Sequence, residues 1–198
     1  MNIVYLGTDY GGWSVDIDSI DDGSTIIDAG LGEDISFLER LSSLRNVNII
    51  GVDPTEKSHK YVSSRSLSNL SLVKSAIAPK GIDKVTLFKN TNPSHVSESY
   101  CSEHGSVGSE AYQSDAVSFS SLISRYSPTL VKMDIEGAEY DVLEECIGVK
   151  QICVEFHHHC IKNKTFEDTL RQIKKLESAG YTQIACKNQI EYTFILRQ

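Results

Sequence analysis

The chain has 198 residues, 40% of them hydrophobic, which is enough for one well-buried core and short for two. Its 27 acidic and 19 basic residues give a net charge of -8, which would repel a phosphate backbone and disfavours nucleic acid as a partner. No apolar run approaches the roughly 20 residues of a membrane span, and the amino terminus lacks the features of a signal peptide. We therefore expect one cytoplasmic domain over residues 1–198, with no membrane span and with residues 1–23 as a lead-in.

The first predicted unit is a strand, a helix and a second strand. Residues 24–29 form a short apolar run that ends in an acid, and the glycine turn "GLGED" leads into a helix over residues 35–44. In that helix Phe37, Leu41 and Leu44 share one apolar face. Residues 47–53 are predicted to form the second strand, and Pro54 suits the start of the next helix. Such short connections predict a right-handed parallel unit.

The middle of the chain is less regular. Residues 70–78 are predicted to form a third strand, and residues 84–89 a fourth strand or a hairpin arm. A polar, serine-rich stretch without periodicity follows over residues 90–116. A stretch of this length inside a compact domain is typical of a substrate lid or mobile segment, and the alternative is a disordered surface insertion.

The alternation of helices and strands resumes at Phe119. Helices are predicted over residues 119–126, 138–147 and 166–180, strands over 129–134 and 151–156, and a closing hairpin over 181–185 and 191–197. In the helix over 138–147 the spacing places Ala138, Val142, Cys146 and Ile147 inward and Glu139, Asp141, Glu144 and Glu145 toward water. In the last helix it places Phe166, Leu170 and Ile173 inward, with Gly180 as the cap. The pattern predicts an α/β fold whose mostly parallel sheet ends in an antiparallel hairpin.

Four predicted strands end in acids, namely Asp28, Asp53, Asp134 and Glu155. Ligands of open parallel sheets bind at the carboxyl ends of the strands, where the winding direction reverses. We therefore expect these carboxylates on a ligand-facing rim. The alternative for Asp28 is a simple role in the turn that starts the next helix.

The first turn indicates which ligand this rim accepts. Gly30 and Gly32 allow a bound molecule to approach the backbone closely, but Glu33 and Asp34 would face a pyrophosphate at the amino end of the helix. A nicotinamide cofactor is therefore disfavoured. S-adenosylmethionine has a sulfonium and an ammonium group and no phosphate, and its ribose diol could bond Asp53, 21 residues after Gly32. Glu33 could equally be an ordinary helix-start residue.

Several blocks of the chain resemble the FkbM-type S-adenosylmethionine-dependent methyltransferases. These blocks are "IIDAGLGEDISFLERL", "IGVDPTEKS", "SFSSLISRYSPTLVKMDIEGAEYDVL" and "ICVEFHHH", of which "KMDIEGAE" is the most specific, and "DYGGW" resembles the lead-in of some members. The resemblance runs from Gly7 to the terminal hairpin and is weakest over residues 90–116. It implies a class I methyltransferase fold, which is a Rossmann-like sheet with helices on both faces, and O-methylation of a sugar or other small hydroxylated metabolite.

The resemblance also implies roles for individual residues. It places Asp28, Gly30 and Gly32 at the methionine end of the cofactor, Asp53 at the ribose, Ala76 and Ile77 near the adenine, and Asp134 near the amino group or the reacting centre. It says nothing specific of the acceptor side, where the chemistry has to be argued from the residues themselves.

A hydroxyl acceptor must lose a proton, and two side chains are candidates for the base. His157 has an ordinary pKa near 6.5, while the pKa of Glu136 would have to be raised by burial or by Asp134. His157 could instead only hydrogen-bond the rim, and Glu136 and Glu139 could be ordinary first-turn acids. A divalent cation on Asp134, Glu136 or Glu155 is a further hypothesis. The run "HHHC" is not a metal site, because adjacent side chains on an extended chain point to opposite faces.

Two other functions remain open from the sequence alone. One is a dinucleotide-dependent oxidoreductase, and the other is a cofactor-binding module without turnover that serves another protein. Trp13, the only tryptophan, could cover the cofactor or fill the core. The chain is short for a separate substrate domain, so we expect the lid, or a second subunit of a homo-oligomer, to complete the pocket.

Overall fold

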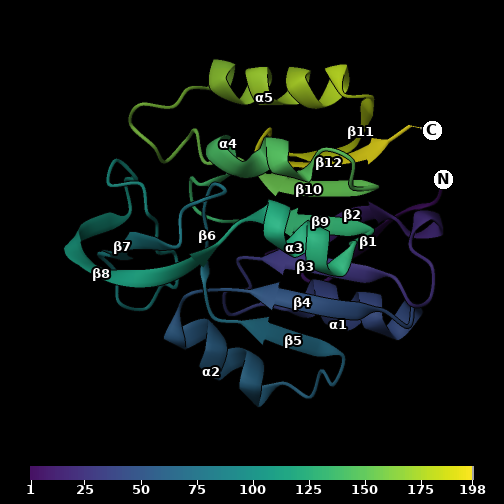
Figure 1. Ribbon diagram of the computed structural model, residues 1–198, viewed down its shortest axis with the longest axis horizontal. Coiled ribbons are helices and arrows are strands. Elements are labelled where there is room, and N and C mark those ends of the chain that lie inside the picture. The colour runs from purple at the N-terminus through teal and green to yellow at the C-terminus, as the bar shows by residue number, and fades with distance from the viewer. Residues whose placement is uncertain (198) are drawn as a thin grey trace.

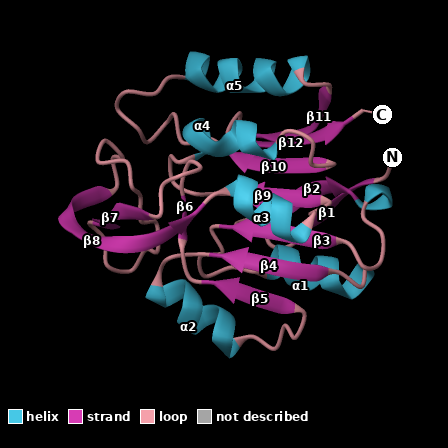
Figure 2. Ribbon diagram, viewed as in Figure 1, coloured by secondary structure: helices cyan, strands magenta, loops and turns pink. Residues whose placement is uncertain are grey.

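A seven-stranded sheet forms the centre of the computed structural model, which describes residues 1–197 (Figure 1; Figure 2). The strand order across it is β11 (Tyr181–Lys187), β12 (Glu191–Leu196), β10 (Gln151–Glu155), β9 (Leu130–Met133), β3 (Thr25–Ala29), β4 (Asn48–Val52) and β5 (Leu70–Val73). Within this sheet β12 runs antiparallel to both of its neighbours, and the other pairs are parallel. The predicted α/β fold with an antiparallel carboxyl-terminal hairpin is confirmed.

Two small sheets and five α-helices complete the described fold of residues 1–197. One sheet pairs β1 (Ile3–Leu6) with β2 (Trp13–Asp16), and the other has the order β6 (Ala76–Ile77), β8 (Val107–Val117), β7 (Lys84–Asn90). The helices are α1 (Ser36–Leu44), α2 (Glu56–Ser64), α3 (Phe119–Tyr126), α4 (Glu139–Val142) and α5 (Phe166–Ser178), with 3-10 turns at Ile17–Ser19 and Leu143–Cys146. No helix among these residues is long and apolar enough to cross a membrane.

Helices cover both faces of the central sheet because successive residues of a strand point to opposite faces. Ile26 and Leu130 belong to the layer that packs under α1, α2 and the β1–β2 hairpin. Their neighbours Ile27 and Val131 belong to the opposite layer, which packs against α3, α4 and α5. Strands that are apolar on both faces are typical of a buried parallel sheet. The core therefore has two layers, one on each side of the sheet.

Two predictions for the middle of the chain are wrong in part. Residues 70–78 do not form one strand, because the chain leaves the central sheet after Val73 and residues 76–77 pair with β8 in the small sheet. Residues 90–116 are not wholly irregular, since residues 107–117 form the long strand β8, which is antiparallel to β7. The prediction of a hairpin arm over residues 84–89 is confirmed. In Figure 1 this ribbon projects from the left end of the sheet.

The predicted helix over residues 138–147 is also shorter and less regular. It consists of α4 and a 3-10 turn, and Ile147, expected to be buried, follows that turn and is 44% exposed. Leu44 and Leu170 were likewise expected to face the core and are exposed. The opposite error concerns Glu139, which was expected to face water and is fully buried. Its carboxylate accepts hydrogen bonds from the backbone amides of Gly137 and His157, which offset the loss of water.

The winding of the sheet reverses between β3 and β9. From β3 the chain runs outward through β4 and β5 and then returns to β9 and β10 on the other side. Gly30, which follows β3, has φ +81° and packs on the loop that follows β9, so closely that a Cβ atom would lie 1.7 Å from the carbonyl oxygen of Asp134. Only glycine fits this position, and the contact fixes two strand ends at the point where such sheets bind ligands.

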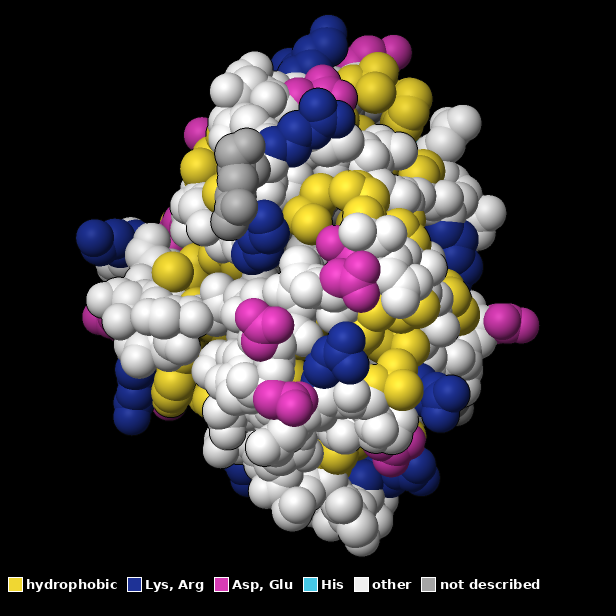
Figure 3. Space-filling model, turned by 90° about the vertical axis from the view of Figure 1, so that its right-hand side faces the viewer, with side chains coloured by type: hydrophobic (Ala, Val, Ile, Leu, Met, Phe, Trp, Pro, Cys, Tyr) yellow, Lys and Arg dark blue, Asp and Glu magenta, His cyan; other side chains and the backbone are white. Residues whose placement is uncertain are grey.

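The opposite end of the sheet, where the strands begin, has a different surface. Figure 3 views the molecule from this side, with basic, acidic and hydrophobic side chains interspersed over it. The amino terminus and the carboxyl end of the described chain lie here, away from the reversal point (Figure 1).

We expect Gly30→Ala to lower the free energy of unfolding by at least about 3 kcal/mol, because both the left-handed backbone and the overlap with Asp134 are penalised. Gly23→Ala is the matched control, since Gly23 has φ +87° and no atom near a built Cβ. The control should lose only about 1–2 kcal/mol. Urea denaturation measures both, and equal losses would contradict the close packing at Gly30.

Candidate functional site

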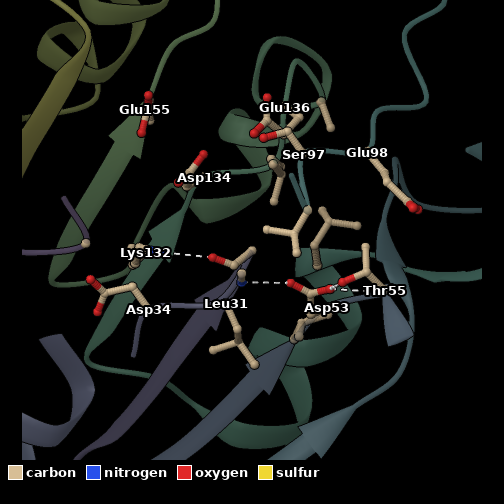
Figure 4. A pocket seen from close by; sticks show the side chains of 18 of the residues that line it. Leu31, Asp34, Asp53, Thr55, Ser97, Glu98, Lys132, Asp134, Glu136 and Glu155 are labelled. Carbon is tan, nitrogen blue, oxygen red and sulfur yellow. Dashed lines mark hydrogen bonds between the residues drawn. The ribbon is translucent and has the colours of Figure 1, made fainter. Parts of the chain in front are cut away.

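A cavity of about 370 Å³ opens at the carboxyl ends of the central strands (Figure 4). Its walls come from the β1–β2 connection, from the loops after β3, β4 and β9, from residues 75–77, from residues 96–100 and from the tip of the β11–β12 hairpin. Among the described residues its walls hold nine acidic side chains and two lysines. The cavity therefore has the size of a small-molecule site and a strongly negative lining.

Most of the sequence-predicted residues line this cavity. The lining residues among them are Gly30, Gly32, Asp53, Ala76, Ile77, Asp134, Glu136 and Glu155. Asp28 and His157 are not part of the lining and lie buried behind it. The rim of carboxylates is thus present, although Asp28 does not face the ligand space.

Asp53 is held in place by three hydrogen bonds. One oxygen accepts from the backbone amide of Thr55 at 2.8 Å and from its hydroxyl at 2.7 Å. The other oxygen accepts from the amide of Gly32 at 3.1 Å, which links the ends of β3 and β4. A carboxylate oxygen can accept two hydrogen bonds, so this second oxygen has one position left for a ligand in the cavity. Thr55, rather than Pro54, caps helix α2.

Asp28 pairs with Lys132, a residue that the sequence reasoning did not single out. The ammonium group lies 2.9 Å from the Asp28 carboxylate and donates to the carbonyl oxygen of Gly30 at 3.0 Å. Burial raises the pKa of Asp28, and Lys132 opposes this effect. A lysine within the otherwise apolar strand sequence "LVKM" was the signal for this pair. The pair supports the glycine turn from behind.

The lead-in residues pack on the start of helix α1. Asp34 accepts hydrogen bonds from the amide of Ser36 at 2.8 Å and from the hydroxyl of Thr8 at 2.5 Å. Tyr10 lines the cavity and is 81% exposed, so it lies at the mouth. Trp13 lines the cavity and belongs to the buried core, so its predicted place in the core is confirmed. The lead-in therefore contributes residues 9–11 and Trp13 to the cavity wall.

At the other end of the cavity, acids gather around His157. Its Nε2 atom lies 3.4 Å from Glu136, 3.6 Å from Asp134 and 3.9 Å from Glu155. Its Nδ1 atom lies 3.1 Å from the buried carboxylate of Glu139. In Figure 4 Asp134, Glu136 and Glu155 lie together, across the cavity from Asp53. The neighbouring His158 instead bonds Thr169, which confirms that the histidine run does not converge on one point.

The pKa values in this cluster differ from what a base on His157 or Glu136 would require. Burial opposes the charge of His157, but Glu139, Glu136 and Asp134 raise its pKa well above the ordinary value. Although burial favours neutral Glu136, the rings of His104 and His157 lower its pKa. Burial raises the pKa of Asp134 to about 6, and burial followed by Asp134 raises that of Glu155 to about 8. With the carboxylates alone around it, His157 therefore favours its charged form, which cannot accept a proton.

Part of the predicted lid region closes this end of the cavity. The hydroxyl of Ser99 donates to the carbonyl oxygen of Glu136 at 2.5 Å, and the hydroxyl of Tyr100 bonds Asp141. His104, also from this region, lies 3.1 Å from the Glu136 carboxylate. Glu136 itself has a left-handed backbone with φ +54°. The connection between β7 and β8 therefore folds onto the loop after β9 and supplies a wall of the cavity.

Solved structures with the same fold are methyltransferases. A precorrin-6y C5,15-methyltransferase from Geobacter metallireducens matches with a TM-score of 0.52 and 14% identity over 90% of this chain and 82% of that one. An rRNA methylase from Streptococcus thermophilus matches with a TM-score of 0.52 and 10% identity over 91% and 92% of the two chains. Fibrillarin from Methanococcus jannaschii gives 0.51 and 9% over 89% and 67%.

These likenesses show a class I methyltransferase fold and leave the substrate open, because the identities are low. No curated protein matches the chain. A family model described as the methyltransferase FkbM domain matches residues 27–182, which include the strands from β3 to β10, their connections and the cavity loops between them. The chain therefore belongs to the FkbM methyltransferase family.

Proposed function

We propose that the protein transfers the methyl group of S-adenosylmethionine to a hydroxyl of a small, carbohydrate-like acceptor. The observation that carries this proposal is Asp53, which lies at the end of β4 and lines the cavity, with one acceptor position left on the oxygen that also accepts the Gly32 amide. An acid in this position can accept hydrogen bonds from a ribose diol. Family membership supports the same donor.

The cavity offers matching surroundings for the rest of this cofactor. Ala76 and Ile77 supply an apolar wall beside Asp53, which suits the adenine ring. Gly30 and Gly32 leave room for the chain that carries the sulfonium, and Asp134 supplies a negative charge for the amino group. Asp28 acts from behind, through Lys132 and the carbonyl oxygen of Gly30.

A dinucleotide fits this lining less well. Its pyrophosphate would lie at the start of α1, next to Glu33 and Asp34. The Asp34 carboxylate is also already bonded to Ser36 and Thr8, so it is part of the turn and cannot move away without losing these bonds. The negative charges of Glu33 and Asp34 disfavour phosphate binding here, whereas they attract a sulfonium and an ammonium group.

Methyl transfer requires an in-line arrangement of acceptor oxygen, methyl carbon and sulfur. In the proposed reaction the bond from the methyl carbon to sulfur breaks, the bond to the acceptor oxygen forms, and the hydroxyl proton passes to a carboxylate of the cavity. Asp134 and Glu136 lie where they can contact the acceptor, and His157, buried behind them, is a positioning residue. Exclusion of water from this enclosed end favours the reaction.

The lining also supports the class of acceptor. The carboxylates of the lining, such as Glu98, and the polar side chains of Ser97 and Asn188 can accept hydrogen bonds from several hydroxyls of one small molecule. The negative charge disfavours a nucleic acid, although some proteins with this fold methylate RNA. Location in the cytoplasm, a single domain and a homo-oligomer stay predictions from the sequence.

We expect the protein to bind S-adenosylhomocysteine and to bind NAD at least about 100-fold more weakly, because only NAD carries a pyrophosphate. Asp53→Asn should weaken S-adenosylhomocysteine binding about 10- to 100-fold, since it removes charge-assisted hydrogen bonds. The matched control Glu177→Gln removes one charge from the exposed face of α5, outside the cavity lining, and should keep the affinity within about threefold. Calorimetric titration measures all three, and tighter binding of NAD would overturn the proposal.

A radiolabelled methyl donor and a panel of sugars and lipid-linked sugars test the reaction itself. We expect label in an acid-stable ether on one acceptor, with kcat for Asp134→Asn lowered at least about 100-fold because the reacting end loses a carboxylate. Thermal melts would verify that the variant is folded. Unchanged transfer by this variant would contradict the site assignment, and transfer only to nitrogen acceptors would contradict O-methylation.

A further inference from the structure

The group formed by Asp134, Glu136 and His157 has the spacing of a coordination site. One ligand atom from each residue lies within 4.8 Å of the other two. Two ligands bound to one ion at about 2.1 Å are about 3.0–3.4 Å apart in octahedral or tetrahedral geometry. The observed separations from His157 Nε2 are 3.4 Å to Glu136 and 3.6 Å to Asp134. An ion could therefore lie at an ordinary distance from His157 Nε2 and from either neighbouring carboxylate oxygen.

The other ring nitrogen of His157 already has a hydrogen-bond partner within the protein. Nδ1 lies 3.1 Å from Glu139 Oε1, and that oxygen also accepts the backbone amide of His157 at 2.8 Å. The second oxygen of Glu139 accepts the amide of Gly137, so the carboxylate is fixed and acceptor-only. It accepts the proton on Nδ1, so that a neutral His157 ring has its Nε2 lone pair directed at the acids and available to a cation. A carboxylate that orients a histidine in this way is typical of metal sites.

Hydrogen bonding among the described residues does not satisfy Nε2. The His157 side chain is 4% exposed, and the distances from Nε2 to its neighbouring carboxylates exceed the range of a charge-assisted hydrogen bond, about 2.7–2.9 Å. A second buried imidazole shows the same pattern. The His104 side chain is 1% exposed, and its Nε2 lies 3.1 Å from Glu136 without forming a hydrogen bond among residues 1–197. Two buried ring nitrogens thus face one carboxylate.

We propose that Asp134, Glu136 and His157 bind a first-row divalent cation such as Mn²⁺, with open positions toward the cavity. One imidazole and two carboxylates suit such ions better than they suit Ca²⁺ and Mg²⁺, which prefer ligand shells made of oxygen atoms only. His104 Nε2 lies 3.1 Å from the same Glu136 oxygen that faces His157 Nε2.

The role of the cation rests on the proposed function. The acceptor hydroxyl would occupy an open position, where the positive charge favours loss of its proton to a carboxylate of the cavity outside the coordination set. The oxygen then forms the new bond to the methyl carbon while the bond from that carbon to sulfur breaks. The cation itself is neither oxidised nor reduced.

Titration of the untagged, cofactor-free chain with Mn²⁺, followed by loss of the free-ion electron paramagnetic resonance signal, tests the site without any methyl transfer. We expect one bound ion, with binding weakened at least about tenfold in both Glu136→Gln and His157→Asn. The asparagine amide keeps a donor near Glu139 and removes only Nε2. Exposed His159→Asn and charge-matched Glu33→Gln are controls that should bind within about twofold of the parent chain.

Circular dichroism would verify the fold of each variant, and Glu136→Gln alone decides the test if His157→Asn does not fold. Absence of Mn²⁺ binding by the parent chain, or equal binding by Glu136→Gln, would overturn the inference, and the cluster would then be a buried imidazolium among acids. A chain that binds S-adenosylhomocysteine but no Mn²⁺ refutes the cation alone. A chain that binds Mn²⁺ but no S-adenosylhomocysteine supports the cation and refutes the proposed donor.

Discussion

The contact between Gly30 and Asp134 is the constraint on which the site depends. It joins the loops after β3 and β9 so closely that no side chain fits between them. Lys132 strengthens the same junction, because its ammonium group reaches Asp28 on one strand and the carbonyl oxygen of Gly30 beyond it. Gly32 then continues to Asp53 at the end of the next strand. Three neighbouring strand ends are thereby fixed relative to one another before any ligand binds.

Many carboxylates lie around this junction, and the groups that neutralise or hydrogen-bond them differ between the two ends of the cavity. At the proposed cofactor end, backbone amides and hydroxyls donate hydrogen bonds to the carboxylates of Asp53 and Asp34. At the proposed reacting end, Asp134 and Glu155 have no such set of amide donors among residues 1–197, and burial raises their pKa values. The carboxylates of the first end therefore already have hydrogen-bond donors within the protein. The second gains stability from any cation that enters, whether a proton, an ammonium group or a metal.

The sequence predicted what local patterns determine. The strand ending in Asp28, the helix over residues 119–126 and the closing hairpin follow from apolar runs, turns and caps, and they agree with the structure. It could not reveal Glu139 or His104, because a helical repeat places Glu139 in water and nothing local marks His104. Their burial follows from contacts with residues far along the chain, such as Glu139 with His157 and His104 with Glu136. Lys132 is intermediate, since a charge within an apolar strand signals a buried partner without naming it.

The two ends of the cavity also differ in what a change of sequence would do to them. The proposed cofactor end is made from strand ends whose geometry the sheet itself requires, so substitutions there should lower the stability of the fold. The acceptor end depends on residues 96–104, which contact Glu136 and Asp141 across 32 to 41 positions of sequence but form no part of the central sheet. This connection can change its side chains while the sheet stays intact. Acceptor choice can therefore diverge within such a fold while donor binding is retained, which agrees with the weak family resemblance over residues 90–116.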